Sequence, residues 1–510
     1  MEGKKLRKIK LGILTIGILI LGVILSLKYG GAADKTEMEF SDRRETEEAP
    51  GARESGTEEP EPELLPFTGS IRVLLKTDGF AGLLHEKATF ISENGNDLIL
   101  TDRDTGETIE EGNRLELTGE DGVLYLNGEP LEGRPRCLRT QAAEAGIRVA
   151  SLTRNAGHPV YGGALEIWPA DEGFYLVNEV PLETYLAYVV PSEMPSGYHM
   201  EALKAQAVCA RTYAYQELST YAYPDCEAHV DDSVSFQVYG NTGRTAGTDR
   251  AVAETAGQIL TCQGSPITAY YFSTSCGATG NQEVWWDGDQ TATPYLAGKT
   301  VDAAGEAVDL SKEEEFNAFL EADHPDGYDA DISWYRWETE IDNKTLSENL
   351  NQALAGRIAA NPNAVLTRLG SRLESRTIKT IGQIRGIDVL ERNEGGAVTK
   401  LQIRGSRHTI EVSTEYNARA LLNVQGGSIR RRDGSRVEGG MLLPSACMRI
   451  TPLFDEKGEL SGWRFTGGGY GHGVGLSQNG ANGMAKQGKG YGEILHFFYT
   501  DVELTDIREM

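Results

Sequence analysis

The chain has 510 residues, 39% of them hydrophobic, and carries 49 Lys and Arg against 76 Asp and Glu, a net charge of −27. This length suffices for two or three domains, and the acidic charge argues against nucleic-acid or anionic-lipid binding by the main body. The 60 glycines and the local apolar runs indicate a packed, loop-rich globular protein.

The amino terminus has the pattern of a membrane anchor. Residues 1–10 are basic, and residues 11–27 are uncharged and mostly apolar. As a helix this run would be roughly 25 Å long, close to the ~30 Å hydrocarbon core of a bilayer. We predict a cytoplasmic basic segment, a transmembrane anchor at 11–29 and an extracytoplasmic main domain. The alternative is a cleaved signal peptide, because GGAAD at 30–34 offers small residues to a peptidase.

Residues 30–66 are rich in Glu, Pro, Ser and Gly and contain hardly any large apolar side chain. Such a segment cannot bury enough apolar surface to offset the entropy lost on ordering. We predict an acidic disordered linker that, if flexible, spans roughly 30 Å. This linker would hold the main domain away from the membrane and within the cell wall.

The next segment is predicted to be β-structure, followed by helices. Residues 67–180 contain short alternating runs separated by Gly, Asn and Asp turns, which predicts the N-terminal β-rich part of the fold. Residues 181–295 begin with two helical patterns, one starting at Pro181 and one from about Met200 to Tyr221. Short strands are expected after the second helix.

The remaining chain changes character twice. Residues 296–370 are charged and helical, and strand-like runs return in residues 371–510. The predicted fold class is therefore α+β: a β-rich globular domain with packed helices and a helical insertion at 296–370. The six cysteines show no C-x-x-C spacing and are too sparse for a disulfide scaffold.

Glu193 lies between Pro191 and Pro195. Each proline fixes its own φ and biases the preceding residue away from helix. We therefore predict a stiff extended turn at 192–194 that presents Glu193 at the entrance of the next helix, a position that suits a catalytic acid. By composition alone, a surface turn with a merely solvated glutamate is the alternative.

Two further stretches carry polar and aromatic residues. GGGYGHGVGLSQNGANG, residues 467–483, can bring backbone close to a ligand and expose His472 at the mouth of a cleft. As a nucleotide loop it is weak, because it lacks G-x-x-x-x-G-K-[ST] and a βαβ context. AYYFSTSCGATGNQEVWW, residues 269–286, is typical of carbohydrate clefts, although alone it could equally be core and turn.

Together these stretches resemble the SpoIID/LytB family, the sporulation stage II protein D and amidase-enhancer group of bacterial cell-wall proteins. The resemblance extends from about Phe67 to Leu504. It is strongest at VPLETYLAYVVPSEMPSGYHMEALKAQAVCARTYA, FQVYG, YYFSTSCGATGNQEVWW, YRWE and GYGHGVGLSQNGANGMAKQGKGYGEILHFFY.

The resemblance implies a SpoIID-like domain and a lytic transglycosylase that acts in sporulation or cell-wall remodelling. Its substrate would be peptidoglycan glycan strands, cleaved between N-acetylmuramic acid and N-acetylglucosamine. The strands would be those stripped of stem peptides by a SpoIIP-like cell-wall amidase, the expected partner.

The resemblance also implies residue roles. It places the catalytic acid on Glu193, within 181–295, which would be the catalytic core part. Arg211 matches a basic family residue on the following helix and Tyr271 matches a tyrosine on a strand, and both are expected to line the cleft as catalytic residues. Three residues are expected to support substrate binding: Ser275, His472 and Gln478.

A single carboxyl group fits this chemistry. Glycoside hydrolases commonly use two carboxylates, whereas a lytic transglycosylase uses the sugar's own C6 hydroxyl. Glu193 would first protonate the glycosidic oxygen and then, as a carboxylate, take the C6 proton, which closes a 1,6-anhydro ring.

No structural zinc and no cofactor are expected. Family members that bind zinc carry a His-Cys pair before the Gln-Val-Tyr stretch, whereas this chain has Ser235 and Phe236 there. Cys226 and His229 lie nearby, but two scattered ligands do not make a tetrahedral site. Phe236 is expected to pack in place of the metal pair.

Two other functions stay open. The same family name covers catalytically silent peptidoglycan-binding proteins that enhance an amidase, and an intact acid motif does not prove turnover. A hydrolase using Cys276 and His472 is a further alternative, but no third residue is identifiable that would orient the base.

Overall fold

The computed structural model describes residues 69–509 apart from 96, 132–133, 143–144, 286–292 and 323. The predicted basic segment, anchor and linker at 1–66 lie outside these residues. Across the described part of the chain, no helix is long and apolar enough to cross a membrane.

The chain divides into two compact units, each described here by itself. The described residues of the N-terminal unit are 69–188 and 230–256, and those of the C-terminal unit are 189–229 and 257–509. The architecture is mixed α and β and rich in strands, as the sequence predicted.

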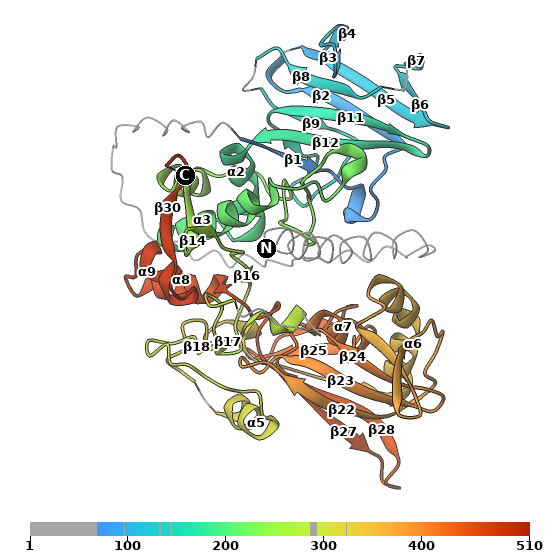
Figure 1. Cartoon of the computed structure of the whole chain (residues 1–510), viewed down its shortest axis with the longest axis vertical. Helices are drawn as coiled ribbons and strands as arrows, with labels where there is room; N and C mark the ends of the chain where they lie inside the picture. Colours follow the sequence, from blue (N-terminus) through green and yellow to red (C-terminus); the bar gives the residue numbers. More distant parts are fainter. Residues whose placement is uncertain are drawn as a thin grey trace, which may run out of the picture. The chain divides into compact units, whose positions relative to one another are not determined.

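Strands build the N-terminal unit (Figure 1). Its elements are β1 Ser70–Leu74, β2 Lys87–Ser92, β3 Leu98–Asp102, β4 Thr108–Gly112, β5 Arg114–Glu120, β6 Val123–Leu126, β7 Glu129–Leu131, β8 Arg136–Thr140, β9 Ile147–Val149, β10 Val160–Tyr161, β11 Ala164–Ala170, β12 Gly173–Pro181, β13 Val230–Asp231 and helix α4 Ala246–Glu254. They form a seven-stranded sheet, β13-β1-β12-β11-β8-β3-β4, and a six-stranded sheet, β10-β9-β2-β5-β6-β7.

Alternating apolar residues explain these sheets. In β5 the side chains of Leu115 and Leu117 are buried while their neighbours are more exposed, which is the period of a half-buried strand. Strand β12 of the first sheet contacts β5 and β6 of the second, so the apolar faces of the two sheets cover each other. The predicted β-rich character of residues 67–180 is confirmed.

Helix α2, Leu182–Glu193, follows β12 directly and corrects one prediction. Pro191 lies inside this helix and Glu193 is its last residue, so residues 192–193 are not an extended turn and Glu193 does not stand at a helix entrance. Pro191 has no backbone N–H to donate to the carbonyl four residues earlier, so the helix lacks one hydrogen bond there, and it ends two residues later. Met194 N still donates to the Val190 carbonyl at 2.9 Å, and Pro195 follows where the helix stops.

One part of the C-terminal unit consists of three helices and a small sheet. The helices are α3 Met200–Glu217, α8 Gln478–Lys486 and α9 Tyr491–Phe498, and the strands are β14 Gln258–Cys262, β15 Ser265–Pro266 and β30 Glu503–Asp506, in the order β15-β14-β30. Helix α3 contacts α8, α9 and β14. Small buried residues such as Ala207 and Ala210 allow this close packing, as the sequence predicted.

Short strand pairs join this part to two larger sheets. The pairs are β16 Tyr271–Phe272 with β29 Leu476–Ser477, and β17 Ala278–Thr279 with β18 Lys299–Thr300. One five-stranded sheet has the order β26-β25-β19-β28-β27, with β19 Trp337–Asp342, β25 Ser428–Arg431, β26 Arg436–Glu438, β27 Met448–Phe454 and β28 Leu460–Gly467. The other has the order β21-β20-β24-β23-β22, with β20 Val365–Leu369, β21 Arg372–Ser375, β22 Ile384–Arg392, β23 Val398–Gly405 and β24 Thr409–Ser413.

Three more helices complete the unit: α5 Glu313–Glu321, α6 Asn343–Ala360 and α7 Glu415–Leu421. Residues 296–370 hold the helices expected there, α5 and α6, but they also supply strands β19 and β20. Strand β19 pairs with β28 and β25, and β20 pairs with β24, so this segment is built into sheets formed with later residues. Whether it was inserted into a simpler domain stays a prediction.

Candidate active site

Glu193 is half-buried at the end of α2, and its main chain is held by Gln478. Gln478 Nε2 donates to the Glu193 carbonyl at 3.1 Å and lies 3.4 Å from Gln206 Oε1. Gln478 is the first residue of α8, and Gln206 is fully buried on α3. Two helices distant in sequence therefore fix the position of Glu193.

Helix α8 also holds the loop that follows Glu193. Tyr198 OH donates to Asn479 Oδ1 at 2.6 Å, and His199 N donates to Asn482 Oδ1 at 2.9 Å. His199 then caps α3, because its ring nitrogen accepts from Glu201 N. The loop between α2 and α3 is thus tied to one face of α8 from the catalytic candidate to the next helix.

A buried aspartate that the sequence did not reveal, Asp329, joins two segments of the site. Its carboxylate accepts hydrogen bonds from Ser275 N at 2.8 Å, Ser275 Oγ at 2.9 Å and Ser477 Oγ at 2.8 Å. Ser477 is the N-cap of α8, so Asp329 positions the helix that carries Gln478. Burial raises the pKa of Asp329 to about 6.

Ser275 itself is 1% exposed. Its hydroxyl donates a hydrogen bond to Asp329 and accepts one from Gly277 N, so both hydrogen bonds are made within the protein. Ser275 therefore supports the site from within. A direct contact between Ser275 and substrate, as predicted, stays a prediction.

Tyr271 and His472 are brought together by backbone. Strand β16 runs parallel to β29, with Tyr271 opposite Leu476, and His472 Nε2 lies 2.9 Å from the Tyr271 carbonyl. Nε2 must donate to this oxygen, and Nδ1 accepts from Val474 N at 3.2 Å. Burial lowers the pKa of His472 to about 4, so the ring is neutral at neutral pH.

The neutral imidazole of His472, hydrogen-bonded at both nitrogens, argues against a hydrolase that would use His472 as its base. Both nitrogens of His472 are occupied by backbone groups, so His472 is not free to act as a base. Cys276 is 2% exposed, and its Sγ lies 3.9 Å from the Ala278 and Gly395 carbonyls. A hydrolase using Cys276 and His472 is not supported.

Aromatic rings surround His472. The ring of Trp285 lies 5.1 Å from the imidazole and 4.3 Å from the ring of Tyr270, centroid to centroid. Phe272 packs 5.5 Å away. Trp285 and Tyr270 are each half-buried, so part of this aromatic cluster is exposed to solvent. Trp286 lies outside the described residues.

The glycine loop passes close to strand β16. Gly471 has φ +112°, and a Cβ atom there would lie 2.8 Å from the Phe272 Cβ. Gly475 has φ +76°, and a Cβ there would lie 2.1 Å from the Tyr270 carbonyl. Because they carry no side chain, these glycines let the loop lie directly against strand β16 and the residue before it. A close approach to ligand, which the sequence suggested for this loop, stays a prediction.

Arg211 is fully buried on α3, and its Nη1 donates to the Gln258 carbonyl of β14 at 3.2 Å. A fully buried guanidinium does not form part of an open cleft surface. Any effect of Arg211 on a reaction would therefore pass through the elements that it holds together. Its predicted catalytic role stays a prediction.

The described residues contain no group of three or more His, Cys, Asp or Glu side chains placed to hold a metal ion. Phe236 is half-buried in the N-terminal unit. Cys226 is buried, its Sγ 3.7 Å from the Tyr223 carbonyl, and His229 stacks on Tyr221 at 4.9 Å. The predicted absence of zinc stays a prediction.

Two residues of the site were missed. Asn479 lies in the same sequence stretch as Gln478, and its place beside Gln478 was the signal that could have revealed it. Asn479 Nδ2 donates to the Ser273 carbonyl at 3.1 Å and to Thr274 Oγ1 at 3.0 Å. Asp329 lies in no motif, so nothing in the sequence distinguished it.

Comparisons with known proteins match two parts of this chain to families and the chain to several relatives. Residues 170–262 match the family described as Stage II sporulation protein, and residues 280–475 match a domain family of unknown function. The amidase enhancer of Bacillus subtilis (strain 168) is 31% identical over 62% of this chain and 40% of its own length. The chain thus spans less than half of that relative.

Two further relatives are matched over more of their length. The stage II sporulation protein D of Bacillus amyloliquefaciens and that of Bacillus subtilis (strain 168) are each 29% identical over 65% of this chain and 76% of their own length. The first family match ends with β14 and includes Glu193 and Arg211. From these matches and the motifs above, the chain belongs to the SpoIID/LytB family.

Proposed function

We propose that this protein is a membrane-anchored lytic transglycosylase that cleaves peptidoglycan glycan strands outside the cytoplasm, with Glu193 as acid and base. The observation that carries the proposal is the fixed position of Glu193. Its carbonyl is held by Gln478, and the loop after it is tied to α8. A proton donor must stay in place relative to the bond it cleaves.

The proposed reaction needs a carboxyl group that begins protonated, because its first step is the donation of a proton to the leaving oxygen. Glu193 would donate its proton to the glycosidic oxygen, so the bond to the anomeric carbon breaks and the leaving sugar keeps a hydroxyl. The carboxylate would then take the proton of the C6 hydroxyl, whose oxygen bonds to the anomeric carbon.

Other residues would position this reaction. The half-buried rings of Trp285 and Tyr270 offer faces for sugar stacking. Asp329 and Gln478 hold the elements on which Glu193 stands. The predicted anchor at 11–29 would keep the enzyme at the membrane, and the linker at 30–66 would let it reach the wall.

The test uses full-length protein, glycan strands freed of stem peptides, and product analysis by mass spectrometry. Glu193→Gln should lower the formation of anhydro-muramic ends by roughly a hundred-fold or more, since it removes the proton donor. Glu217→Gln is the matched control, because Glu217 is the last residue of α3 and burial raises its pKa to about 7. Loss of activity in Glu217→Gln but not in Glu193→Gln would overturn the assignment of the acid.

A second function is supported by the name of one relative, amidase enhancer. In that function the protein would bind glycan strands without cleaving them and would raise the activity of a cell-wall amidase. Intact strands after incubation with both parent and Glu193→Gln, together with faster peptide release by an added amidase, would favour it.

A further inference from the structure

One end of a five-stranded sheet in the C-terminal unit carries basic residues across its whole width. The strand order is β21-β20-β24-β23-β22, and β24, β23 and β22 lie side by side in Figure 1. All neighbouring strands are antiparallel, so the starts of β21, β24 and β22 meet the ends of β20 and β23 at this end. The basic residues there are Arg372 on β21, Arg368 on β20, Arg404 on β23 and Arg385 on β22, with Arg407 and His408 in the turn between β23 and β24.

The five arginines among these residues form a basic row, whose order is set by the pairing of the strands. Arg372 lies opposite Leu369 at the turn between β20 and β21, and Arg404 lies opposite Thr409 beside the next turn. Within that turn, the Arg407 main chain is hydrogen-bonded to the segment before β22. Neighbouring strands lie about 4.8 Å apart, so the four steps from β21 to β22 give the basic row a length of roughly 19 Å.

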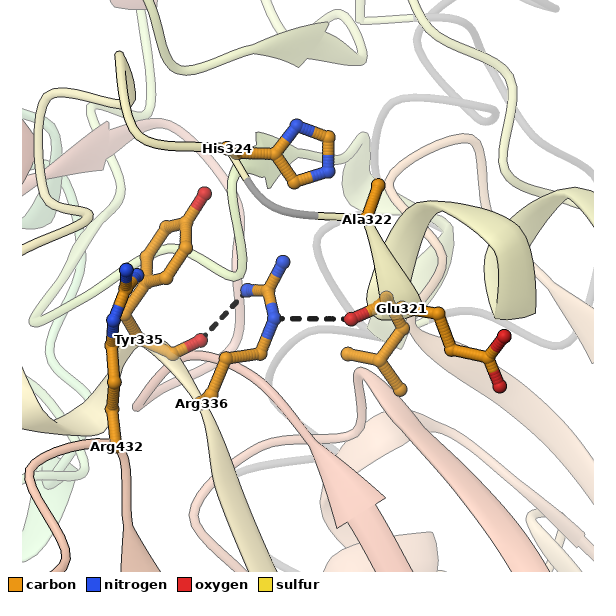
Figure 2. Close-up of a pocket in the computed structure, with 7 residues that line it drawn as sticks. Glu321, Ala322, His324, Tyr335, Arg336 and Arg432 are labelled. Atoms are coloured by element: carbon orange, nitrogen blue, oxygen red, sulfur yellow. Dashed lines mark hydrogen bonds between the residues drawn. The ribbon is translucent and has the colours of Figure 1, made fainter.

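Three members of the basic row have exposed side chains that form no ion pair or hydrogen bond with any described residue: Arg372, Arg385 and Arg407. Arg336 of the same unit shows the contrast. Its guanidinium donates to the main-chain carbonyls of Leu320 and Tyr335 at 3.3 and 2.8 Å (Figure 2). Arg336 therefore supports the fold, whereas the three exposed guanidinium groups can be reached by a ligand.

The acids of this sheet do not cancel the charge of the basic row. Its strands carry four acidic residues, and three of them are paired: Glu411 with Arg368, Asp388 with Arg404 and Glu391 with Lys400. The fourth, Glu374, lies two residues along β21 from Arg372. Three unpaired cations thus stand against one acid in a chain of net charge −27, so the charge is locally reversed here.

The surroundings of the basic row lack aromatic side chains. Residues 361–415 contain no Phe, Tyr or Trp. Proteins that bind single-stranded nucleic acids stack the bases on aromatic rings, and sugar faces also stack on such rings. The basic row therefore fits the charges of an anionic chain rather than bases or sugar rings.

We propose that the basic row binds a linear polyol-phosphate polymer, in which each short repeat carries one phosphate diester. Guanidinium groups bind phosphate through charge-assisted, often paired hydrogen bonds. Closely spaced phosphates match cations on strands about 4.8 Å apart, whereas a stripped glycan strand carries one carboxylate for every two sugars. The proposal does not depend on glycan cleavage.

The test measures binding of a fluorescently labelled, short poly(glycerol phosphate) chain to the full-length protein by fluorescence anisotropy. We expect the affinity to fall steeply as salt is added, because each phosphate contact releases a counter-ion. Inorganic phosphate should compete poorly, since it engages one position of the basic row at a time. A parent protein that does not bind the polymer would overturn the proposal.

A triple variant locates the binding. Arg372→Gln, Arg385→Gln and Arg407→Gln together should weaken binding roughly ten-fold or more, because three charge-assisted contacts are lost. The matched control replaces three arginines of the other five-stranded sheet and changes the net charge equally: Arg430→Gln, Arg436→Gln and Arg464→Gln. Equal unfolding temperatures of parent and variants show that both triple variants fold. Equal weakening by the two triple variants would overturn the proposal.

Competition decides the class of polymer. Oligothymidylate with the same number of phosphates, or stripped glycan strands, should displace the labelled polymer less well than unlabelled poly(glycerol phosphate). Equal or better displacement by either would assign the basic row to that polymer and overturn the proposal. Glu193→Gln should bind the labelled polymer as the parent does, so the failure of the proposed reaction and the failure of this proposal are distinguishable.

One further variant should act in the opposite direction. Glu374→Gln removes the unpaired acid of the sheet, and we expect it to tighten binding of the labelled polymer roughly two-fold. Weaker binding by this variant would contradict a role for the charge of the basic row.

Discussion

Two buried carboxylates, one in each unit, accept hydrogen bonds from different kinds of groups. Glu166 on β11 of the N-terminal unit is 2% exposed and accepts hydrogen bonds from Arg72 at 2.9 and 2.6 Å and from Arg103 at 3.0 Å. Asp329 of the C-terminal unit is fully buried and is bonded by neutral groups of Ser275 and Ser477. It forms no ion pair with any described residue.

The difference appears in the direction of the two pKa shifts. Burial opposes ionisation of both groups, but the hydrogen bonds and charges of Arg72 and Arg103 outweigh it and lower the pKa of Glu166. Without a cation, burial dominates at Asp329 and raises its pKa to about 6. Glu166 joins segments of the N-terminal unit through ion pairs. Asp329 has no cation among the described residues to balance its charge, but it holds two segments of the candidate site in position.

Removing the paired carboxylate should have the largest effect on stability. Glu166→Gln would remove the charged partner of the buried Arg72 and the half-buried Arg103, and we expect a loss of about 3–5 kcal/mol in the free energy of unfolding. Urea unfolding at pH 7 measures it. Because the pKa of Glu166 is lowered on folding, its contribution is present above its unfolded pKa and is lost as pH falls through the folded value.

Glu340→Gln is the control for this variant. Glu340 pairs with Arg464, but the side chains are 52% and 43% exposed. A solvent-exposed pair contributes about 0–1 kcal/mol. Equal losses from Glu166→Gln and Glu340→Gln would contradict the view that burial makes the first pair structural.

Asp329→Asn should reveal the opposite pH dependence. A carboxyl whose pKa is raised by folding stabilises the protein most at low pH, and this contribution is lost as pH rises toward about 6. Asn cannot ionise, so the stability of the variant relative to the parent should rise by about 3 kcal/mol between about pH 4 and pH 7. His472 titrates in this range with opposite sign, but it is present in both proteins and cancels in the difference.

The same variant separates position from charge. If Asp329 positions α8 through Ser477, Asp329→Asn should lower glycan cleavage while retaining wall binding, because the amide cannot accept all three hydrogen bonds. A flat difference in stability across this pH range would mean that Asp329 is ionised in the folded protein at all these pH values.

Sequence patterns predicted the local strands and helices better than they predicted the residues that hold the candidate site in position. The alternation of Leu115 and Leu117 and the small residues of α3 specify strands and a helix directly. The predicted turn at Glu193 was wrong because the packing of the buried Val189 and Val190 keeps this segment helical despite the missing hydrogen bond of Pro191. Asp329 escaped notice because its partners lie 54 and 148 residues away, and no local pattern encodes such contacts.

Gln478→Met should give the smallest change in stability and test the neutral contacts directly. Met has a similar length but cannot donate to the Glu193 carbonyl, so we expect a loss of about 1 kcal/mol and lower glycan cleavage. Gln487→Met, at the exposed C-cap of α8, is the control and should change neither quantity. If Gln478→Met loses stability but keeps full activity, this contact only holds the fold together. Loss of activity at nearly unchanged stability would mean that the neutral contacts of the C-terminal unit fix Glu193 for the reaction.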